Sequence, residues 1–319
     1  MGAPRRIQRT TFRARVRMCS MTCTRLLRSH SPNTTRLATS MILAGLPTSP
    51  ARTLGRALQL ALILGGCAVR TVAAQDARPI RALYVTGGGF HDFKAQEKIV
   101  PPGISARTNI VWTIDNTADT STKALIARHR TAAWADSFDV VVYNMSFSYV
   151  VDPEWIERIA HAHRDKGVAA VILHGATHSY RRSTTDAWRE LMGVVSMRHD
   201  TQREFPRLER LAPDNPIVKA LPKDWGPGSD ELYNIDRAWP TMTPLVQAWS
   251  IEGEKHFPVV WTNSYGKARV FATTMGHNNR TMSDSVYLGL VTRGLLWAVG
   301  KLGPDGTPVA GYGPRTTAP

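Results

Sequence analysis

The run Val168–Leu173 is the feature of this chain that most restricts its fold. Each of its residues is apolar, and the run stops abruptly at His174-Gly175. A short run that is apolar at every position and rich in β-branched residues is typical of a central strand buried on both faces. Because Gly175 allows a sharp turn, the sequence predicts a buried strand that ends in a tight turn carrying a histidine.

Strand and helix patterns alternate from residue 81 to about residue 193. This rhythm predicts an α/β fold with a doubly wound, mainly parallel sheet, because right-handed crossovers return each strand in the same direction. Besides 168–173, strands are predicted over 81–86, 109–115 and 138–145, and helices over 120–134, over 153–166 and through Trp188 and Leu191.

The last part of the chain has a different rhythm. A β-hairpin is predicted over 257–273 and a closing helix over 285–300. Between 194 and 250 seven prolines interrupt the chain, which predicts an irregular segment that faces the substrate. Residues 303–319, rich in Pro, Gly and Thr, predict a flexible tail, so that 75–302 forms a single domain.

The formal net charge of +15 belongs to one end of the chain. Residues 1–74 contain twelve arginines and no Lys, Asp or Glu, whereas the remainder has 28 Lys and Arg against 25 Asp and Glu. The charge therefore predicts a disordered basic leader and argues against a nucleic-acid-binding face on the folded part. Cys19, Cys23 and Cys67 all lie in this leader, so the body offers no disulfide, thiolate nucleophile or thiolate metal ligand.

Residues 41–74 have the layout of a bacterial secretory signal. Arginines precede the apolar run 57–69, and small residues precede Gln75. Cleavage there predicts a soluble periplasmic protein, whereas Leu64-Gly65-Gly66-Cys67 fits a lipoprotein signal that leaves a lipid anchor at Cys67. We expect export in either form, and the apolar run is too short to predict a membrane span.

Residues 1–40 show no hydrophobic period. They fit a disordered extension, a mitochondrial presequence or sequence upstream of a start at Met41, and we favour the last.

Several polar side chains follow predicted strands. His174 and His178 follow the strand 168–173, His91 follows Gly87-Gly88-Gly89 after the first strand, and His277 follows the hairpin. In open α/β sheets ligands bind beyond the carboxyl ends of the strands, so we expect these imidazoles near one site. The alternative is that each merely hydrogen-bonds its neighbours in a loop.

The acid pair Asp230-Glu231 lies within the proline-rich segment. Glu231 is a candidate general base and Asp230 a candidate acceptor for sugar hydroxyls, although both also fit the first turn of a helix. Tyr233 and Trp261 are candidates for stacking on a sugar ring, or ordinary core aromatics.

Several stretches together resemble the ThuA-like, or trehalose-utilisation, family. The resemblance covers roughly residues 80–302 and includes a histidine at position 199. The stretches are VTGGGFHDF (85–93), LHGATHSY (173–180), SDELYNI (229–235), FPVVWTNSYGKARVFATTMGH (257–277) and YLGLVTRGLLWAVG (287–300).

This resemblance implies a class I glutamine amidotransferase-like fold of flavodoxin-like layout. It also implies a link to carbohydrate catabolism, including disaccharides oxidised to keto-sugars. The amidotransferases of this superfamily carry a cysteine nucleophile on the turn after the elbow strand, where this chain has His174-Gly175-Ala176. Amidotransferase chemistry is therefore excluded by residue type.

We predict an exported carbohydrate-processing protein that acts on a sugar or 3-keto-glycoside. His174 and His277 would carry protons with the help of Glu231, and His91, His178, Asp230, Tyr233 and Trp261 would bind the substrate. One alternative is a non-catalytic carbohydrate-binding or scaffold protein. Another is a metal-dependent sugar enzyme with a divalent cation on His174, His178, His277 and Glu231, whose spacing matches no known motif. The sequence leaves the oligomeric state open.

The leader is expected to be dispensable for folding, because the strand pattern begins only at Ile80. A chain that begins at Gln75 should be soluble and should unfold in one cooperative transition followed by circular dichroism. Aggregation of this shortened chain beside well-behaved full-length protein would overturn the domain boundary.

Overall fold

The computed structural model describes residues 77–201, 205 and 207–315. The predictions for the leader (residues 1–74, including Met41 and Cys67) concern residues outside this description. None of the described helices combines the length and apolar character that a membrane span requires.

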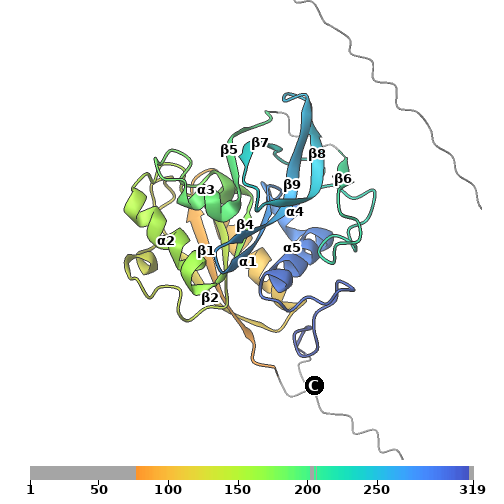
Figure 1. Ribbon diagram of the computed structural model, residues 1–319, viewed down its shortest axis with the longest axis horizontal. Coiled ribbons are helices and arrows are strands. Elements are labelled where there is room, and N and C mark those ends of the chain that lie inside the picture. The colour runs from red at the N-terminus through yellow and green to blue at the C-terminus, as the bar shows by residue number, and fades with distance from the viewer. Residues whose placement is uncertain (1–76, 202–204, 206, 316–319) are drawn as a thin grey trace, which may run out of the picture. The chain divides into compact units, whose positions relative to one another are not determined.

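An eight-stranded mixed sheet forms the centre of the described chain (Figure 1). Five strands, β2, β1, β3, β4 and β10, run parallel, and β9, β8 and β6 continue the sheet in antiparallel fashion. In spatial order the strands are β2 (Ile110–Asn116), β1 (Ile80–Gly88), β3 (Val140–Ser146), β4 (Ala169–Leu173), β10 (Ala268–Thr273), β9 (Lys255–Tyr265), β8 (Thr243–Ser250) and β6 (Leu208–Arg210). The predicted doubly wound, mainly parallel sheet is confirmed.

Helices cover both faces of this sheet. The helices α2 (Pro153–Lys166) and α3 (Ala187–Met192) contact each other on one side, and α1 (Phe93–Ser105) and α5 (Ser285–Ala298) contact each other on the other (Figure 1). The remaining elements are two short 3₁₀ turns, η1 (Ala127–Arg130) and η2 (His174–His178), the helix α4 (Asn279–Ser283), and a separate antiparallel pair, β5 (Val194–His199) with β7 (Tyr233–Ala238).

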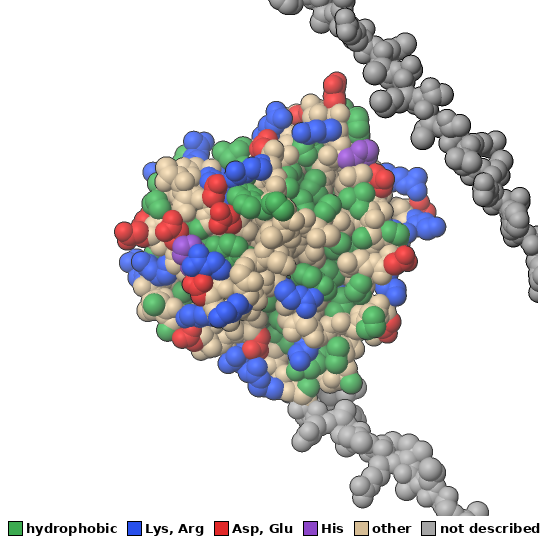
Figure 2. Space-filling view, in the orientation of Figure 1, with side chains coloured by type: hydrophobic (Ala, Val, Ile, Leu, Met, Phe, Trp, Pro, Cys, Tyr) green, Lys and Arg blue, Asp and Glu red, His purple; other side chains and the backbone are tan. Residues whose placement is uncertain are grey.

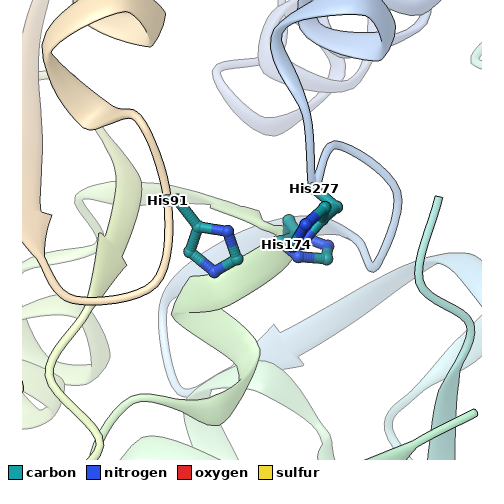
Figure 3. A group of neighbouring side chains, drawn as sticks. All are labelled: His91, His174 and His277. Atoms are coloured by element: carbon teal, nitrogen blue, oxygen red, sulfur yellow. The ribbon is translucent and has the colours of Figure 1, made fainter. Parts of the chain in front are cut away.

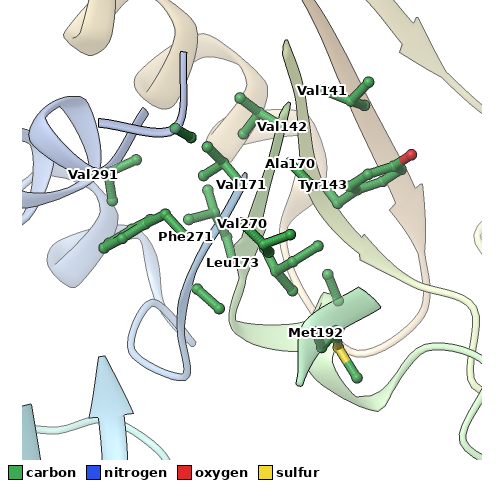
Figure 4. Packing of buried hydrophobic residues seen from close by; sticks show 14 of the residues in the cluster. Val141, Val142, Tyr143, Ala170, Val171, Leu173, Met192, Val270, Phe271 and Val291 are labelled. Atoms are coloured by element: carbon green, nitrogen blue, oxygen red, sulfur yellow. The ribbon is translucent and has the colours of Figure 1, made fainter. Parts of the chain in front are cut away.

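The central strands are buried on both faces, as the apolar runs predict. Every residue of β3 and β4 is buried. Figure 4 shows Val171 directed toward Phe271 and the α5 residue Val291, while Tyr143 and Met192 lie on the opposite side of the strands. The core thus fixes the register of the strands whose ends carry the histidines.

Local sequence signals define α2 well. The Asp152 carboxylate accepts hydrogen bonds from the backbone N–H groups of Glu154 and Trp155, and proline occupies the first turn. Gly167 ends the helix in the left-handed conformation, with φ 77°. The predicted helix 153–166 is therefore confirmed.

The predicted helix over 120–134 is wrong, because this segment forms turns and only the short η1. Ser121 donates its N–H to the Asp119 carboxylate, and Lys123 donates to the Ser121 hydroxyl. Such local bonds from side chain to backbone compete with the helical ladder.

The predicted irregularity of 194–250 is also wrong in part, because β5, β6, β7 and β8 lie within it. Pro240 lies in the turn between β7 and β8, and Pro244 lies in β8 beside a register shift. Proline is tolerated in turns and beside irregularities of a ladder, because its missing N–H costs little there.

Residues after Leu302, for which the sequence predicts a flexible tail, make defined contacts as far as they are described. The Tyr312 carbonyl accepts hydrogen bonds from the Thr108 hydroxyl and from the Asn109 backbone N–H. These contacts hold the segment against the chain that leads into β2.

The surface charge agrees with the balanced composition of the body. On the face shown in Figure 2, Lys and Arg side chains are interspersed with Asp and Glu. No large field of one sign is visible on that face.

His129 is fully buried and packs edge-on against Trp134, with ring centroids 4.6 Å apart. Neither ring nitrogen has a hydrogen-bond partner among the residues that the structure describes. Burial, helped by the charges of His163 and Arg128, lowers the pKa of His129 to about 3. As the pH falls, the unfolded chain therefore protonates His129 near the ordinary pKa of 6.5, whereas the folded chain does so only near pH 3.

Stability supplied by the neutral His129 is thus complete above pH 6.5 and is lost as pH falls toward 3. His129→Leu should flatten the decline of unfolding free energy between pH 6 and pH 4 by about 1.4 kcal/mol per pH unit. Urea titrations at several pH values measure this slope, and the difference at pH 8 reports packing alone. Equal slopes in both proteins would contradict the buried neutral state.

Candidate functional site

The carboxyl ends of β1, β3, β4 and β10 meet at one edge of the sheet, because these strands run parallel. The chain reverses its direction of winding between β1 and β3, the kind of switch point where open α/β sheets bind ligands. A side chain at Gly88 would place its Cβ 2.4 Å from the Ser146 carbonyl oxygen, so glycine is required where β1 ends against β3.

Glu231 is the acidic centre of this edge. Its Oε2 atom lies 3.3 Å from His174 Nε2 and 3.1 Å from His277 Nδ1. Its Oε1 atom lies 3.8 Å from Nε2 of His199, the last residue of β5. The structure therefore brings together His174, Glu231 and His277, as the sequence predicts, and adds His199.

His91 completes this group. Its ring lies edge-on to both other histidines that follow parallel strands, with centroids 4.8 Å from His174 and 5.0 Å from His277 (Figure 3). Segments that are distant in the sequence thus supply one cluster of imidazoles.

His174 occupies a strained turn directly after β4, with φ 38°. It is almost fully buried, and its Nδ1–H donates to the Thr274 carbonyl at 2.6 Å. That bond requires a proton on Nδ1, and Nε2 is directed at Glu231 and at the Tyr233 hydroxyl, each 3.3 Å away.

The electrostatics of the cluster favour a charged carboxylate. Burial alone would raise the pKa of Glu231, but hydrogen bonds from His174 and His277 and the nearby His199 outweigh burial and hold it well below its usual value. Burial, followed by the neighbouring imidazoles of His174 and His277, lowers the pKa of His91 to about 2. Glu231 is thus ionised and His91 neutral over the physiological range.

A cavity of about 300 Å³ opens beside these groups. Phe90 lies at it with 72% of its surface exposed and φ 77°, so an aromatic ring is held toward solvent in a strained conformation. The lining residues are Phe90, His91, Ser146, Ser148, His178, Arg181, His199, Glu231, Tyr233 and His277.

Sequence reasoning did not select Phe90, Arg181 or His199 as site residues. Phe90 and Arg181 each lie within three residues of a predicted site histidine, His91 or His178, a signal that neighbours on such turns also face the cavity. His199 ends a strand that the sequence pattern did not reveal.

His178 and Tyr233 both line the cavity, but they also pack on each other. Their rings stack with centroids 3.9 Å apart and planes 9° apart, so one face of Tyr233 is covered. The Arg181 guanidinium donates to His178 Nδ1, and His178 Nε2–H donates to the Ser196 hydroxyl. Burial, followed by the charge of Arg181, keeps the pKa of His178 well below its ordinary value, so this ring is a neutral wall.

The predicted role of Asp230 as an acceptor for sugar hydroxyls is not supported by its position. Its buried carboxylate accepts the backbone N–H groups of Glu231, Gly276 and His277, at 2.8, 2.9 and 2.9 Å. Asp230 therefore fixes the backbone that carries the two residues Glu231 and His277.

The predicted stacking role of Trp261 is wrong. Its ring is fully buried in the core between β9 and α3, and its indole N–H donates to the Met192 carbonyl at 2.8 Å. The Trp261 ring fills the space between the strand and the helix, and such close packing leaves no room for a ligand to reach it.

A family model for ThuA, described as trehalose utilisation, matches residues 86–298. The chain belongs to the ThuA family. The predicted family is thereby confirmed, and its matched range contains all the cavity-lining residues. No curated protein sequence matches the chain.

Two solved ThuA-like proteins are similar to this ThuA family member. One, from Parabacteroides merdae ATCC 43184, has 19% identity and a TM-score of 0.55, covering 75% of this chain and 98% of its own. The other, from Bacteroides uniformis ATCC 8492, has 16% identity and a TM-score of 0.54, covering 73% of this chain and 96% of its own. Both support the fold.

A glutamine amidotransferase from Thermotoga maritima is also similar, with 14% identity and a TM-score of 0.40 over 70% of this chain and 99% of its own. In this ThuA member the turn after β4 begins at His174.

The anchoring role of Asp230 can be tested by Asp230→Asn. The new amide group turns a donor toward a backbone N–H that now donates to the carboxylate, so unfolding free energy should fall by roughly 1–3 kcal/mol. Asp284→Asn is the matched control, because Asp284 accepts two N–H groups at the start of α5 and asparagine caps helices as well as aspartate. Urea denaturation measures both, and an equal small effect would show that Asp230 is no special anchor.

Proposed function

We propose that this ThuA family member is an enzyme that processes a sugar or a 3-keto-glycoside by acid–base chemistry. The observation that carries the proposal is the Glu231 carboxylate, held within 3.3 Å of two imidazoles beside a cavity at the carboxyl ends of parallel strands. A family linked to trehalose utilisation favours a carbohydrate as the substrate.

His277 is the imidazole placed to reach the substrate. Its side chain is 25% exposed and lines the cavity, and its Nδ1 lies 3.1 Å from the carboxylate. A carboxylate behind an imidazole stabilises the imidazolium that forms when the other nitrogen accepts a proton. His174, 1% exposed, acts behind it by holding Glu231 in place.

A 3-keto-glycoside offers such a base an acidic C–H bond. His277 takes the proton from the carbon between the keto group and the glycosidic carbon, and the C–H electron pair forms an enolate. Collapse of the enolate breaks the glycosidic C–O bond, and the leaving oxygen takes the proton from the imidazolium. The products are an unsaturated keto-sugar and an alcohol, with no oxidant or reductant consumed.

The cavity suits one sugar ring. Its volume of about 300 Å³ is at the lower end of small-molecule sites. Phe90 presents an exposed aromatic face on which the apolar face of a pyranose can stack, and Arg181, Ser146 and Ser148 offer hydrogen-bonding groups. A second hollow of about 700 Å³ over the ends of β1 and β2 shares His91 with the cavity and can take the remainder of a disaccharide.

Turnover of oxidised and unoxidised disaccharides, with products identified by NMR, tests the proposal. His277→Ala should lower turnover of the best substrate by at least about 100-fold, the usual contribution of a proton-transferring group. His256→Ala is the control, because His256 lies on β9 and pairs with Glu209.

Unchanged turnover in a folded protein lacking both His174 and His277 imidazoles would refute the proposed chemistry. Binding of disaccharides without turnover of any of them would favour the alternative, a non-catalytic carbohydrate-binding or scaffold protein.

A further inference from the structure

Three imidazoles at the cavity form a nearly equilateral group. The ring centroids of His91, His174 and His277 are 4.8, 5.0 and 5.3 Å apart, and one ligating nitrogen from each lies within 4.8 Å of the others. Figure 3 shows that the three side chains come from separate segments of the chain. We propose that these histidines bind one divalent transition-metal ion, of which zinc is the best fit.

The ring spacing agrees with a tetrahedral ion. Zinc–nitrogen bonds of about 2.0–2.1 Å at tetrahedral angles place the centroids of imidazole ligands about 5 Å apart and the ligating nitrogens about 3.4 Å apart. The centroids already have this spacing, whereas the nitrogens lie within 4.8 Å and must close by at most about 1.5 Å. Rotation of the rings without backbone movement can supply this.

The nitrogens are available for a cation. His174 uses Nδ1 to donate to a backbone carbonyl, the outer contact that commonly orients a metal-bound histidine, and this leaves Nε2 inward. The Nδ1 atom of His91 is buried and makes no hydrogen bond within the described residues. The Nδ1 atom of His277 faces the Glu231 carboxylate at 3.1 Å. Gly175 leaves room for the His91 ring, since a Cβ there would lie 2.9 Å from its Nε2.

The local charge also favours a cation. Glu231 places one negative oxygen 3.1 and 3.3 Å from two of the imidazoles, which suits a fourth ligand or the base for a bound water. The set of ligands differs from the one that the sequence predicts, because that set contains His178 and not His91. The His178 ring is held by Arg181 and Ser196 and packs on Tyr233, so His91 takes its place.

This inference concerns the site of the proposed function and changes its assignment of roles. With the ion bound, the three imidazoles are ligands, the ion polarises the substrate carbonyl, and Glu231 is the remaining proton acceptor. Metal binding can nevertheless be measured without any substrate, so the two proposals fail separately.

The test is calorimetric titration of zinc into chelator-treated full-length protein, with metal content measured after dialysis. One saturable equivalent is expected. His91→Gln and His277→Gln should each weaken it at least 100-fold, whereas His256→Gln, at an exposed position of β9, should not. Cobalt substitution distinguishes this equivalent from binding at Cys19, Cys23 or Cys67, because thiolate ligands give charge-transfer bands that imidazoles lack.

Unweakened binding in both site variants, or no saturable equivalent at all, would overturn the metal site. Full turnover by the metal-free protein would show that the reaction does not require the metal, and it would leave the acid–base proposal intact. Stoichiometric zinc that depends on His91 and His277, with no turnover of any sugar, would establish the metal site and remove the proposed function.

Discussion

The contact on which this site depends is the close approach of the buried Glu231 carboxylate to the imidazoles of His174 and His277. Removing a carboxylate from water costs several kcal/mol unless charges and hydrogen bonds compensate. Here the compensation comes from nitrogens 3.1 and 3.3 Å away, on segments that follow β10 and β4. The position of each segment therefore depends on the others, and the site cannot be assembled from one element alone.

Asp230 supplies the second constraint. A carboxylate that accepts three backbone N–H groups fixes the turn carrying His277 and the chain carrying Glu231 in one arrangement. The adjacent acids of this pair thus have different roles, since Asp230 organises backbone and Glu231 faces the cavity. The close packing of β1 on β3 at Gly88 then sets where His91 enters.

The sequence predicted the parts of this structure that local physics decides. Fully apolar runs identified β3 and β4, cap residues bounded α2, and the histidines after parallel strands identified the edge where His91, His174 and His277 meet. What failed depended on contacts distant in sequence. Trp261 was a candidate for stacking on a sugar, but its indole packs in the core and donates to the Met192 carbonyl. The strand β7 was not predicted, because its partner β5 is distant in the sequence. His199, at the end of β5, was missed for the same reason.

The central claim is that the cavity beside Glu231 and His277 is where a carbohydrate binds and reacts. A crystal structure of the His277→Ala protein with a 3-keto-disaccharide tests this claim most directly, because the slowed variant should hold the intact substrate. The account predicts a sugar ring against Phe90, with its keto-bearing end toward Glu231 and the vacated His277 position. A sugar bound only in another hollow of the molecule, such as the one lined by Arg128 and Trp134, would contradict it.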